Sequence, residues 1–358
     1  MTSARRVPTF PLLVLLALLL ALLSPRSAAT TNRRLPAYGA DITQVTVSGL
    51  SSGAYMAGQF AVAYSSIVNG AALVAGGPYY CASQPGVEPF VPYLVNALTT
   101  CMNPADAQAA PPDPALLWSR TLELSRAGLI DDADNVRRQA IYLFSGRSDH
   151  TVTSAVVDQA YGYYRMAGVK TLRYRDNIDA GHAMITDNSA DTECALTAAP
   201  YINNCALALA REMFDTLYAD LKPSSEHPSG TLIRFDQRPF APLRASLDDD
   251  GFAYVPASCR RTSCRVHVAF HGCRQGDEVV GDKFYAHAGY NPVADANAII
   301  VLYPQVQPSG FYPYNPRGCW DFWGYSSFDP FHPDFHTRDA VQMQAVRAML
   351  ERLGQTPR

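Results

Sequence analysis

Short apolar runs alternate with longer amphipathic stretches along most of the chain. The runs are four or five residues long, rich in Val, Ile, Leu, Ala and aromatic residues, and several end at a glycine. Such runs are typical of buried strands, whereas apolar residues at helical spacing are typical of helices packed on one face. We predict strands at 45–48, 71–75, 140–144, 171–174, 266–270 and 299–303, and helices at 52–64, 152–166, 205–221 and 337–353. Strands that alternate with helices predict an α/β fold with a mostly parallel sheet flanked by helices.

The first 29 residues depart from this pattern and predict a secretory signal peptide. Arg5 and Arg6 precede an unbroken apolar run at 12–23, and small residues follow at 27–29. A membrane anchor is the alternative, but the run is shorter than the about 20 residues that span a bilayer. We expect cleavage after Ala29, which leaves residues 30–358 as the secreted chain, extracellular or periplasmic in transit.

Composition narrows the class of protein. The chain has 358 residues and a formal net charge of −3, and 48% of its residues are hydrophobic. This apolar content and modest charge exclude intrinsic disorder. An acidic balance argues against nucleic-acid binding that depends on phosphate contacts. The length allows one large globular domain or two smaller ones.

The chain has eight cysteines, all after the predicted signal peptide. An even number of cysteines in an exported protein favours disulfides. Eight cysteines allow 105 pairings, and pairing of nearest neighbours is the simplest hypothesis. It gives Cys81–Cys101, Cys194–Cys205, Cys259–Cys264 and Cys273–Cys319. A zinc site is the alternative, but the sequence has no C-x-x-C or H-E-x-x-H pattern, so we expect no metal.

A candidate nucleophile lies in the sequence G-L-S-S-G at 49–53, between the first predicted strand and a predicted helix. In a G-x-S-x-G elbow the central serine, here Ser51, sits on a sharp strand-to-helix turn that exposes its hydroxyl. An ordinary Gly/Ser turn is the alternative interpretation. The backbone N–H that follows the nucleophile, here that of Ser52, is expected to donate to an oxyanion.

Candidate partners for Ser51 follow in the chain order serine, acid, histidine that is typical of α/β-hydrolases. Asp149 follows the strand at 140–144, and His182 follows the strand at 171–174. Asp149 could instead cap the next helix, and His182 could be a surface residue. His150 is a competing histidine next to the acid. We predict a triad of Ser51, Asp149 and His182, without a cofactor.

The expected second oxyanion loop stands at an unusual place in the chain. An H-G pair at 271–272 follows the strand at 266–270, more than two hundred residues after Ser51, although hydrolases place it before the serine. Circular permutation would reconcile this order, with the ancestral ends joined in the polar, Pro- and Ser-rich segment at 222–230. We therefore predict one α/β-hydrolase domain at 30–358 with a permutation seam near 222–230.

Four stretches resemble a known family. They are S-G-L-S-S-G-A-Y-M at 48–56, A-G-H-A-M at 180–184, H-G-C-R-Q at 271–275 and C-W-D-F-W-G-Y at 319–325. Together they resemble the single-domain, circularly permuted extracellular poly(3-hydroxybutyrate) (PHB) depolymerases of the α/β-hydrolase superfamily. The resemblance implies the triad named above, and oxyanion amides at Ser52 and Cys273. Related esterases for other esters share the H-G-C element.

A run of aromatic residues at 311–335 also bears on the substrate. It holds 10 aromatic residues in 25 positions, interspersed with Pro and Gly, which favours a loop. It could form an exposed rim that adsorbs to a polyester, or it could pack a disulfide-linked loop onto the core. We predict substrate contacts at Trp320, Trp323 and Tyr325.

The sequence as a whole predicts a secreted serine esterase that cleaves PHB-type polyesters to 3-hydroxyacid oligomers through an acyl-enzyme. Its expected partner is a hydrophobic polyester surface, and we expect a monomer that binds neither nucleic acid nor membrane once the signal is removed. One alternative is an esterase for feruloyl, acetyl or short soluble esters. Another is a non-catalytic polymer-binding protein.

Overall fold

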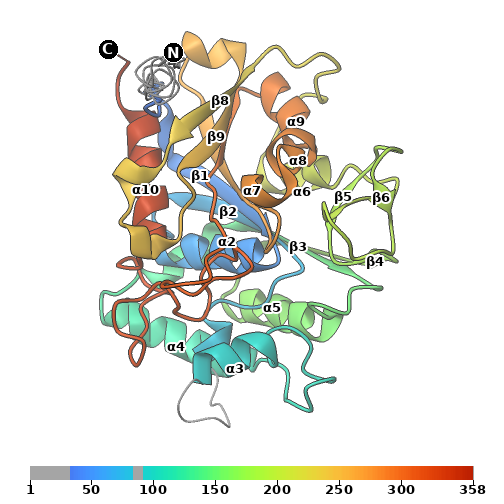
Figure 1. Cartoon of the computed structure of the whole chain (residues 1–358), viewed down its shortest axis with the longest axis vertical. Coiled ribbons are helices and arrows are strands. Elements are labelled where there is room, and N and C mark those ends of the chain that lie inside the picture. The colour runs from blue at the N-terminus through green and yellow to red at the C-terminus, as the bar shows by residue number, and fades with distance from the viewer. Residues whose placement is uncertain (1–32, 84–91, 358) are drawn as a thin grey trace, which may run out of the picture. The chain divides into compact units, whose positions relative to one another are not determined.

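The structure is a computed structural model that describes residues 33–83 and 92–357 (Figure 1). The predicted signal peptide lies outside the described residues. From Arg34 onward the chain forms one compact unit. Among the described helices, none has the length and apolar character needed to cross a membrane.

An eight-stranded sheet forms the centre of this unit. Its strands are β1 (Asp41–Leu50), β2 (Val68–Val74), β3 (Ala140–Gly146), β4 (Thr171–Ile178), β8 (Thr231–Asp236), β9 (Asp250–Val255), β10 (Arg265–Phe270) and β11 (Ile299–Tyr303). They lie in the order β4-β3-β2-β1-β10-β11-β9-β8. The six strands from β4 to β11 pair in parallel, while β9 and β8 are antiparallel to their neighbours. A separate small sheet is formed by β5 (Met184–Thr186), β7 (Ile202–Asn204) and β6 (Thr192–Glu193).

The chain enters this sheet in the middle. It begins with β1 and passes outward through β2 and β3 to β4 at one edge. It then reappears at the opposite edge as β8 and β9, and returns to the centre with β10 beside β1 and β11 beside β10. Strand β1, which precedes the candidate nucleophile, is therefore central, and its last six residues are buried.

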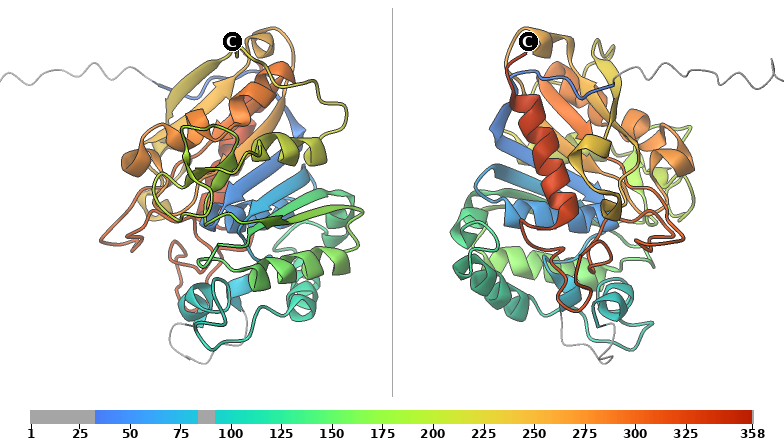
Figure 2. Two further views of the ribbon diagram at one scale, coloured as in Figure 1. Left: turned by 90° about the vertical axis from the view of Figure 1, so that its right-hand side faces the viewer. Right: turned by 60° about the vertical axis from the view of Figure 1, so that its left-hand side comes forward.

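Helices cover the sheet (Figures 1 and 2). They are α2 (Ser52–Ala63), α3 (Pro92–Leu98), α4 (Pro114–Arg126), α5 (Ser154–Met166), α6 (Leu209–Leu217), α7 (Asp277–Val280), α8 (Lys283–His287), α9 (Tyr290–Ala296) and α10 (Val341–Gly354). Short 3₁₀ turns are η1 (Cys81–Ser83), η2 (Ala133–Arg138), η3 (Arg238–Phe240), η4 (Leu243–Ala245) and η5 (Ala257–Arg260). Every residue of α2 is buried, so this helix has no face exposed to solvent.

Most of the predicted elements are present. The six predicted strands fall in β1, β2, β3, β4, β10 and β11, and the predicted helices correspond to α2, α5, α6 and α10. Helix α6 is shorter than the predicted 205–221. The prediction missed the antiparallel strands β8 and β9, helices α3 and α4, and the small sheet.

Candidate active site

Ser51 occupies a tight turn between β1 and α2. Its backbone lies at φ 58° and ψ −122°, a conformation that non-glycine residues rarely adopt and that is associated with functional sites. Its N–H donates to the carbonyl of Val74 at 2.9 Å, which fixes the turn to the end of β2. This strained strand–turn–helix geometry is the one that projects a nucleophilic serine at the edge of a sheet.

The two glycines of the motif are required by backbone contacts. A Cβ on Gly49 would lie 2.3 Å from backbone atoms of Gly53. A Cβ on Gly53 would lie 2.4 Å from the carbonyl oxygens of Phe270 and His271. Helix α2 therefore starts in direct contact with the end of β10, at a distance that only glycine permits.

Asp149 and His182 come together at the carboxyl ends of the parallel strands, where Ser51 also lies. Asp149 Oδ2 lies 2.7 Å from His182 Nδ1, and both side chains are buried. Asp149 Oδ1 accepts hydrogen bonds from the N–H groups of Thr151 and Val152 at 2.8 and 3.0 Å. The carboxylate is thus fixed as an acceptor, which places a proton on Nδ1 and leaves Nε2 of His182 as the basic nitrogen.

The competing histidine does not take part in this pair. His150 is exposed, and its backbone carbonyl accepts a hydrogen bond from Asn103 at 3.1 Å. Gly181, next to His182, is required by close backbone packing. A Cβ there would lie 2.3 Å from the carbonyl oxygen of Leu196, so the glycine lets the His182 loop pack against 194–197.

Backbone hydrogen bonds connect Ser51 to this pair across the strand ends. Beyond the bond from Ser51 to Val74, the N–H of Ala75 donates to Phe144, and that of Ser148 donates to Ala180. The hydrogen bonds of the described residues do not include one between Ser51 Oγ and His182 Nε2. In enzymes without bound substrate this contact is often long and shortens in the complex.

A second loop, after β10, faces the start of α2. His271 Nδ1 donates to the carbonyl of Gly272 at 2.7 Å, and His271 Nε2 accepts the N–H of Val306 at 3.2 Å. Gln275 Oε1 accepts the N–H of Gly272 at 2.8 Å. Within the described part of the chain, the N–H groups of Ser52 and Cys273 donate to no acceptor. Two unused donors near a nucleophile are what an oxyanion requires.

Buried histidines make the fold sensitive to acid. Burial lowers the pKa of His271 to about 4 and that of His267 to about 3, and the bond to Gly272 opposes this only partly at His271. In the unfolded chain a histidine has a pKa of about 6.5. Because the folded protein resists protonation, their contribution to stability is complete above pH about 6.5 and is lost as the pH falls toward about 4 for His271 and about 3 for His267.

We therefore expect the free energy of unfolding to decrease from pH 7 to pH 4.5, which urea titrations at several pH values would measure. The variant His267→Asn should lose stability at pH 7, but its stability should depend less on pH than that of the wild type over this range. An equal dependence in both proteins would contradict this assignment.

The eight cysteines form the four pairs that the sequence hypothesis named: Cys81–Cys101, Cys194–Cys205, Cys259–Cys264 and Cys273–Cys319. The last pair joins the loop after β10 to the aromatic segment. Groups of three or more His, Cys, Asp or Glu side chains that could hold a metal ion do not occur among the described residues.

The aromatic residues at 311–335 divide into exposed and buried sets. The strongly exposed ones are Phe311, Tyr312, Tyr314, Phe328 and Phe331. Trp320 is completely buried, and its ring lies 5.0 Å from that of Phe270. The hydroxyl of Tyr325 donates to the carbonyl of Cys319 and accepts hydrogen bonds from the side-chain amides of Asn315 and Gln342.

These positions revise the predicted substrate contacts. The ring of Trp320 packs under the loop after β10 and has no exposed surface. The prediction that Trp320 contacts substrate therefore does not fit its position. Tyr325 is mainly a structural residue, and Trp323 is partly exposed between Phe322 and Tyr325. Pro313 and Pro330 stand within two residues of Phe311, Phe328 and Phe331, and this nearby proline is a sequence signal for an exposed loop.

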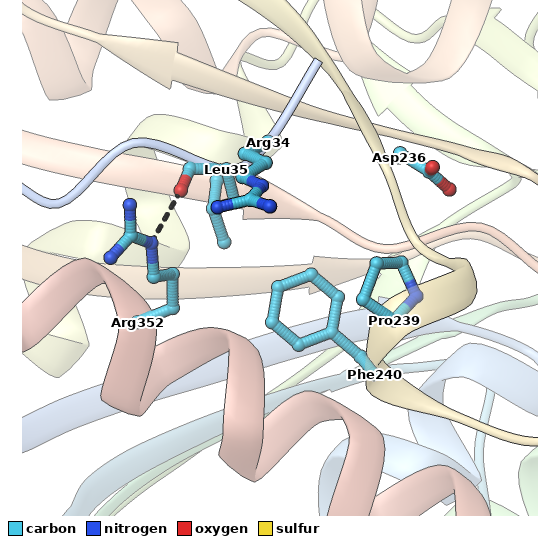
Figure 3. A pocket seen from close by; sticks show the side chains of 6 residues that line it. All are labelled: Arg34, Leu35, Asp236, Pro239, Phe240 and Arg352. Carbon is cyan, nitrogen blue, oxygen red and sulfur yellow. Dashed lines mark hydrogen bonds between the residues drawn. The ribbon is translucent and has the colours of Figure 1, made fainter. Parts of the chain in front are cut away.

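A separate cavity of about 570 Å³ lies away from these residues (Figure 3). Its lining residues are Arg34, Leu35, Asp236, Pro239, Phe240 and Arg352. Arg352 Nε donates to the Leu35 carbonyl at 2.7 Å. It contains none of the predicted site residues and no serine or histidine, so the chemistry lies elsewhere.

Comparison with known proteins identifies relatives of this chain. No family model matches the chain. A poly(3-hydroxybutyrate) depolymerase of Delftia acidovorans is 37% identical over 327 residues, which cover 89% of this chain and 61% of that protein. The chain thus spans less than two thirds of that relative. A polyhydroxybutyrate depolymerase of Talaromyces funiculosus is 34% identical and covers 87% of this chain and 90% of its own length.

Two solved structures match the fold. One is a PHB depolymerase from Penicillium funiculosum, and the other is a serine-to-alanine variant of a PHB depolymerase complexed with an R3HB trimer. Each has a TM-score of 0.78, 31% sequence identity, and coverage of 90% of this chain and 100% of its own.

The fold and these matches define a carboxylic ester hydrolase of the α/β class. More specifically, the chain belongs to the family of PHB depolymerases. The predictions of family, fold class and enzyme class are confirmed, and hydrolysis of PHB is the activity for which these relatives are named.

Proposed function

We propose that this chain cleaves PHB-type polyesters by acyl transfer to Ser51. The observation that carries the proposal is the hydrogen bond between Asp149 and His182 at the strand edge that also holds the strained Ser51 turn. The Ser51 Oγ–H proton passes to His182 Nε2 as Oγ attacks the ester carbonyl, and Asp149 stabilises the resulting imidazolium. The N–H groups of Ser52 and Cys273 bind the oxyanion.

Attack of Ser51 gives a tetrahedral intermediate, and its collapse breaks the ester bond. The leaving alkoxide end of the polymer takes the proton from His182, and Ser51 keeps the acyl group. Water, deprotonated by His182, then attacks the acyl-enzyme and releases a 3-hydroxyacid oligomer with a free carboxylate. The step needs no cofactor, because both proton transfers and the nucleophile come from the chain.

The proposed site of action is extracellular. Four disulfides in one chain are characteristic of oxidising compartments. A polymer granule cannot enter a cell, so a depolymerase that meets its substrate outside must be exported. The N-terminal sequence pattern described above would direct this export.

We also infer that the single domain is circularly permuted, with its seam at 222–230. The sheet is entered at its centre by β1, and the segment between α6 and β8 runs along α9. The N–H groups of Ser225 and Gly230 donate to Pro292 and Asp295, at 2.9 and 3.0 Å. The N–H groups of Tyr38 and Gly39 donate to Leu353 and Gln355, so the two ends of the domain are adjacent, as permutation requires.

The exposed aromatic residues are proposed to adsorb the enzyme to the polymer. We expect the double variant Phe328→Ser/Phe331→Ser to bind PHB granules at least about 10-fold more weakly, because each buried phenyl ring contributes about 2 kcal/mol. Hydrolysis of a soluble nitrophenyl ester should be unchanged, since both rings are exposed and outside the triad. A matched control is Leu232→Ser, on the far edge strand β8. Unchanged granule binding of the double variant would contradict this role.

A turbidity assay on PHB granules, run beside a soluble nitrophenyl ester, tests the proposed function. The proposal predicts clearing of granules and release of 3-hydroxyacid oligomers. Hydrolysis of feruloyl, acetyl or nitrophenyl esters without granule clearing would instead support the soluble-ester alternative. Granule binding without hydrolysis of any ester would support a non-catalytic polymer-binding protein.

A further inference from the structure

The two amides proposed for the oxyanion hole are linked by one hydrogen bond and one disulfide. The backbone N–H of Trp320 donates to Ser52 Oγ at 3.2 Å. The preceding residue, Cys319, is disulfide-bonded to Cys273. Because Ser52 and Cys273 carry the two amides, the side chain of one donor residue is connected through residues 319–320 to the side chain of the other. Where α2 meets the end of β10, backbone contact completes a ring.

The segment that closes this ring is held firmly on both sides. The buried Trp320 ring packs against Phe270 and His271, with centroids 5.0 and 5.8 Å away. Asn315 accepts the N–H of Cys319 at 2.9 Å and donates to its carbonyl at 3.0 Å. A displacement of the Trp320 backbone would therefore disturb the loop after β10 rather than be absorbed locally.

Asp321 fixes the next residues. Its buried carboxylate accepts the backbone N–H groups of residues 323–326 and the hydroxyl of Ser326. Gln59 of α2 donates to the Asp321 carbonyl at 2.9 Å. The segment is thus hydrogen-bonded to the nucleophile helix at Gln59 and at Ser52. Only the Ser52 contact involves a residue that carries a proposed oxyanion donor.

We propose that the Ser52 hydroxyl is a positioning group that sets the separation of the two oxyanion amides. This inference rests on the proposed function. An alanine at this position would offer the same backbone N–H, so the hydroxyl acts through Trp320 and the disulfide. Without it, the Trp320 N–H has no acceptor, the segment shifts, and the Cys273 amide moves with it. Misplaced donors weaken the binding of the transition state more than the binding of the ester substrate. As a result kcat falls while KM is retained.

The direct test is Ser52→Ala with a soluble nitrophenyl ester. We expect kcat to fall about 10-fold, less than the about 100-fold cost of losing a whole oxyanion donor, with KM within about twofold of wild type. Ser48→Ala is the matched control, because Ser48 is a buried serine on β1 that bonds His267 and Tyr290 at 2.8 Å. It should lose stability and keep kcat. A wild-type kcat in Ser52→Ala, or equal kcat losses in both variants, would overturn the proposal.

A double-mutant cycle tests the ring itself. Opening it at the disulfide with Cys273→Ala/Cys319→Ala and at the hydrogen bond with Ser52→Ala should give losses of kcat that do not multiply, since either change opens the same ring. Losses that multiply would show that the two links act independently, and would overturn the proposal. The conservative variant Ser52→Cys keeps a weak acceptor and should recover part of kcat relative to Ser52→Ala. No recovery counts against the proposal.

Failure of this inference is distinct from failure of the proposed function. An inactive Ser51→Ala together with a fully active Ser52→Ala would overturn only the positioning role. Turnover retained by Ser51→Ala would overturn the proposed function, and the inference with it.

Discussion

Replacing Ser51 by alanine should reduce ester hydrolysis by about 10⁶-fold, which is the order of loss found when the nucleophile of a serine hydrolase is removed. The Ser51 hydroxyl forms the acyl-enzyme, and the neighbouring Ser52 hydroxyl is buried and accepts the N–H of Trp320. Adsorption to PHB granules should remain, because the exposed aromatic residues are unchanged. Initial rates on a soluble nitrophenyl ester and granule pull-down would measure both effects.

Thermal unfolding provides the control for Ser51→Ala. The variant should be at least as stable as wild type, since alanine needs no more space than serine in the strained turn. A folded variant that retains more than about 1% of wild-type kcat would contradict the nucleophile assignment, because the residual rate from binding and oxyanion stabilisation alone is far lower.

Asp149→Asn should give the second largest effect, a fall of about 10⁴-fold in kcat. The Asp149 carboxylate accepts a hydrogen bond from the Nδ1–H group of His182, whereas the amide of asparagine can present its own N–H group there. The imidazole would then carry its proton on Nε2, facing Ser51, and could no longer act as a base. Steady-state kinetics on the soluble ester would measure this loss.

Asp158→Asn is the matched control for the loss of charge. Asp158 is exposed on α5 and accepts a hydrogen bond from Tyr174 at 2.8 Å. Its substitution should leave kcat within about twofold of wild type, since exposed polar contacts contribute little. If Asp149→Asn kept more than a tenth of wild-type kcat while folded, the acid of the triad would have to be another residue.

The sequence predicted those parts of the fold in which burial on both faces produces a continuous apolar run. The central strands β1, β2, β3, β10 and β11 are of this kind. Strand β8 is an edge strand with charged and exposed positions, T-L-I-R-F-D, and it has no such run. Helix α4 was missed for a similar reason, since most of its residues are only partly buried.

The turn that carries Ser51 could be predicted from the sequence because close backbone contacts require its two glycines. The glycines at 49 and 53 are needed where α2 touches β10, so they mark the turn independently of its function. Asp149 and His182 were predicted from chain order and from their places after predicted strands, and in the structure the two side chains lie 2.7 Å apart.

The burial of Trp320 could not be read from residue type. An aromatic residue in a Pro- and Gly-rich loop can face solvent or the core. Here Trp320 is buried, and the carboxylate of the next residue, Asp321, accepts the N–H groups of residues 323–326. An aspartate three residues before Gly324 is a sequence signal for such a turn.

Covalent labelling with a phosphonate ester is the most direct test of the central claim, that Ser51 is the nucleophile of a polyester hydrolase. The account predicts one label per chain, located on the peptide that contains Ser51, with loss of granule clearing in proportion to labelling. Ser51→Ala should take up no label. A label on another residue, or full granule clearing by the labelled protein, would contradict the account.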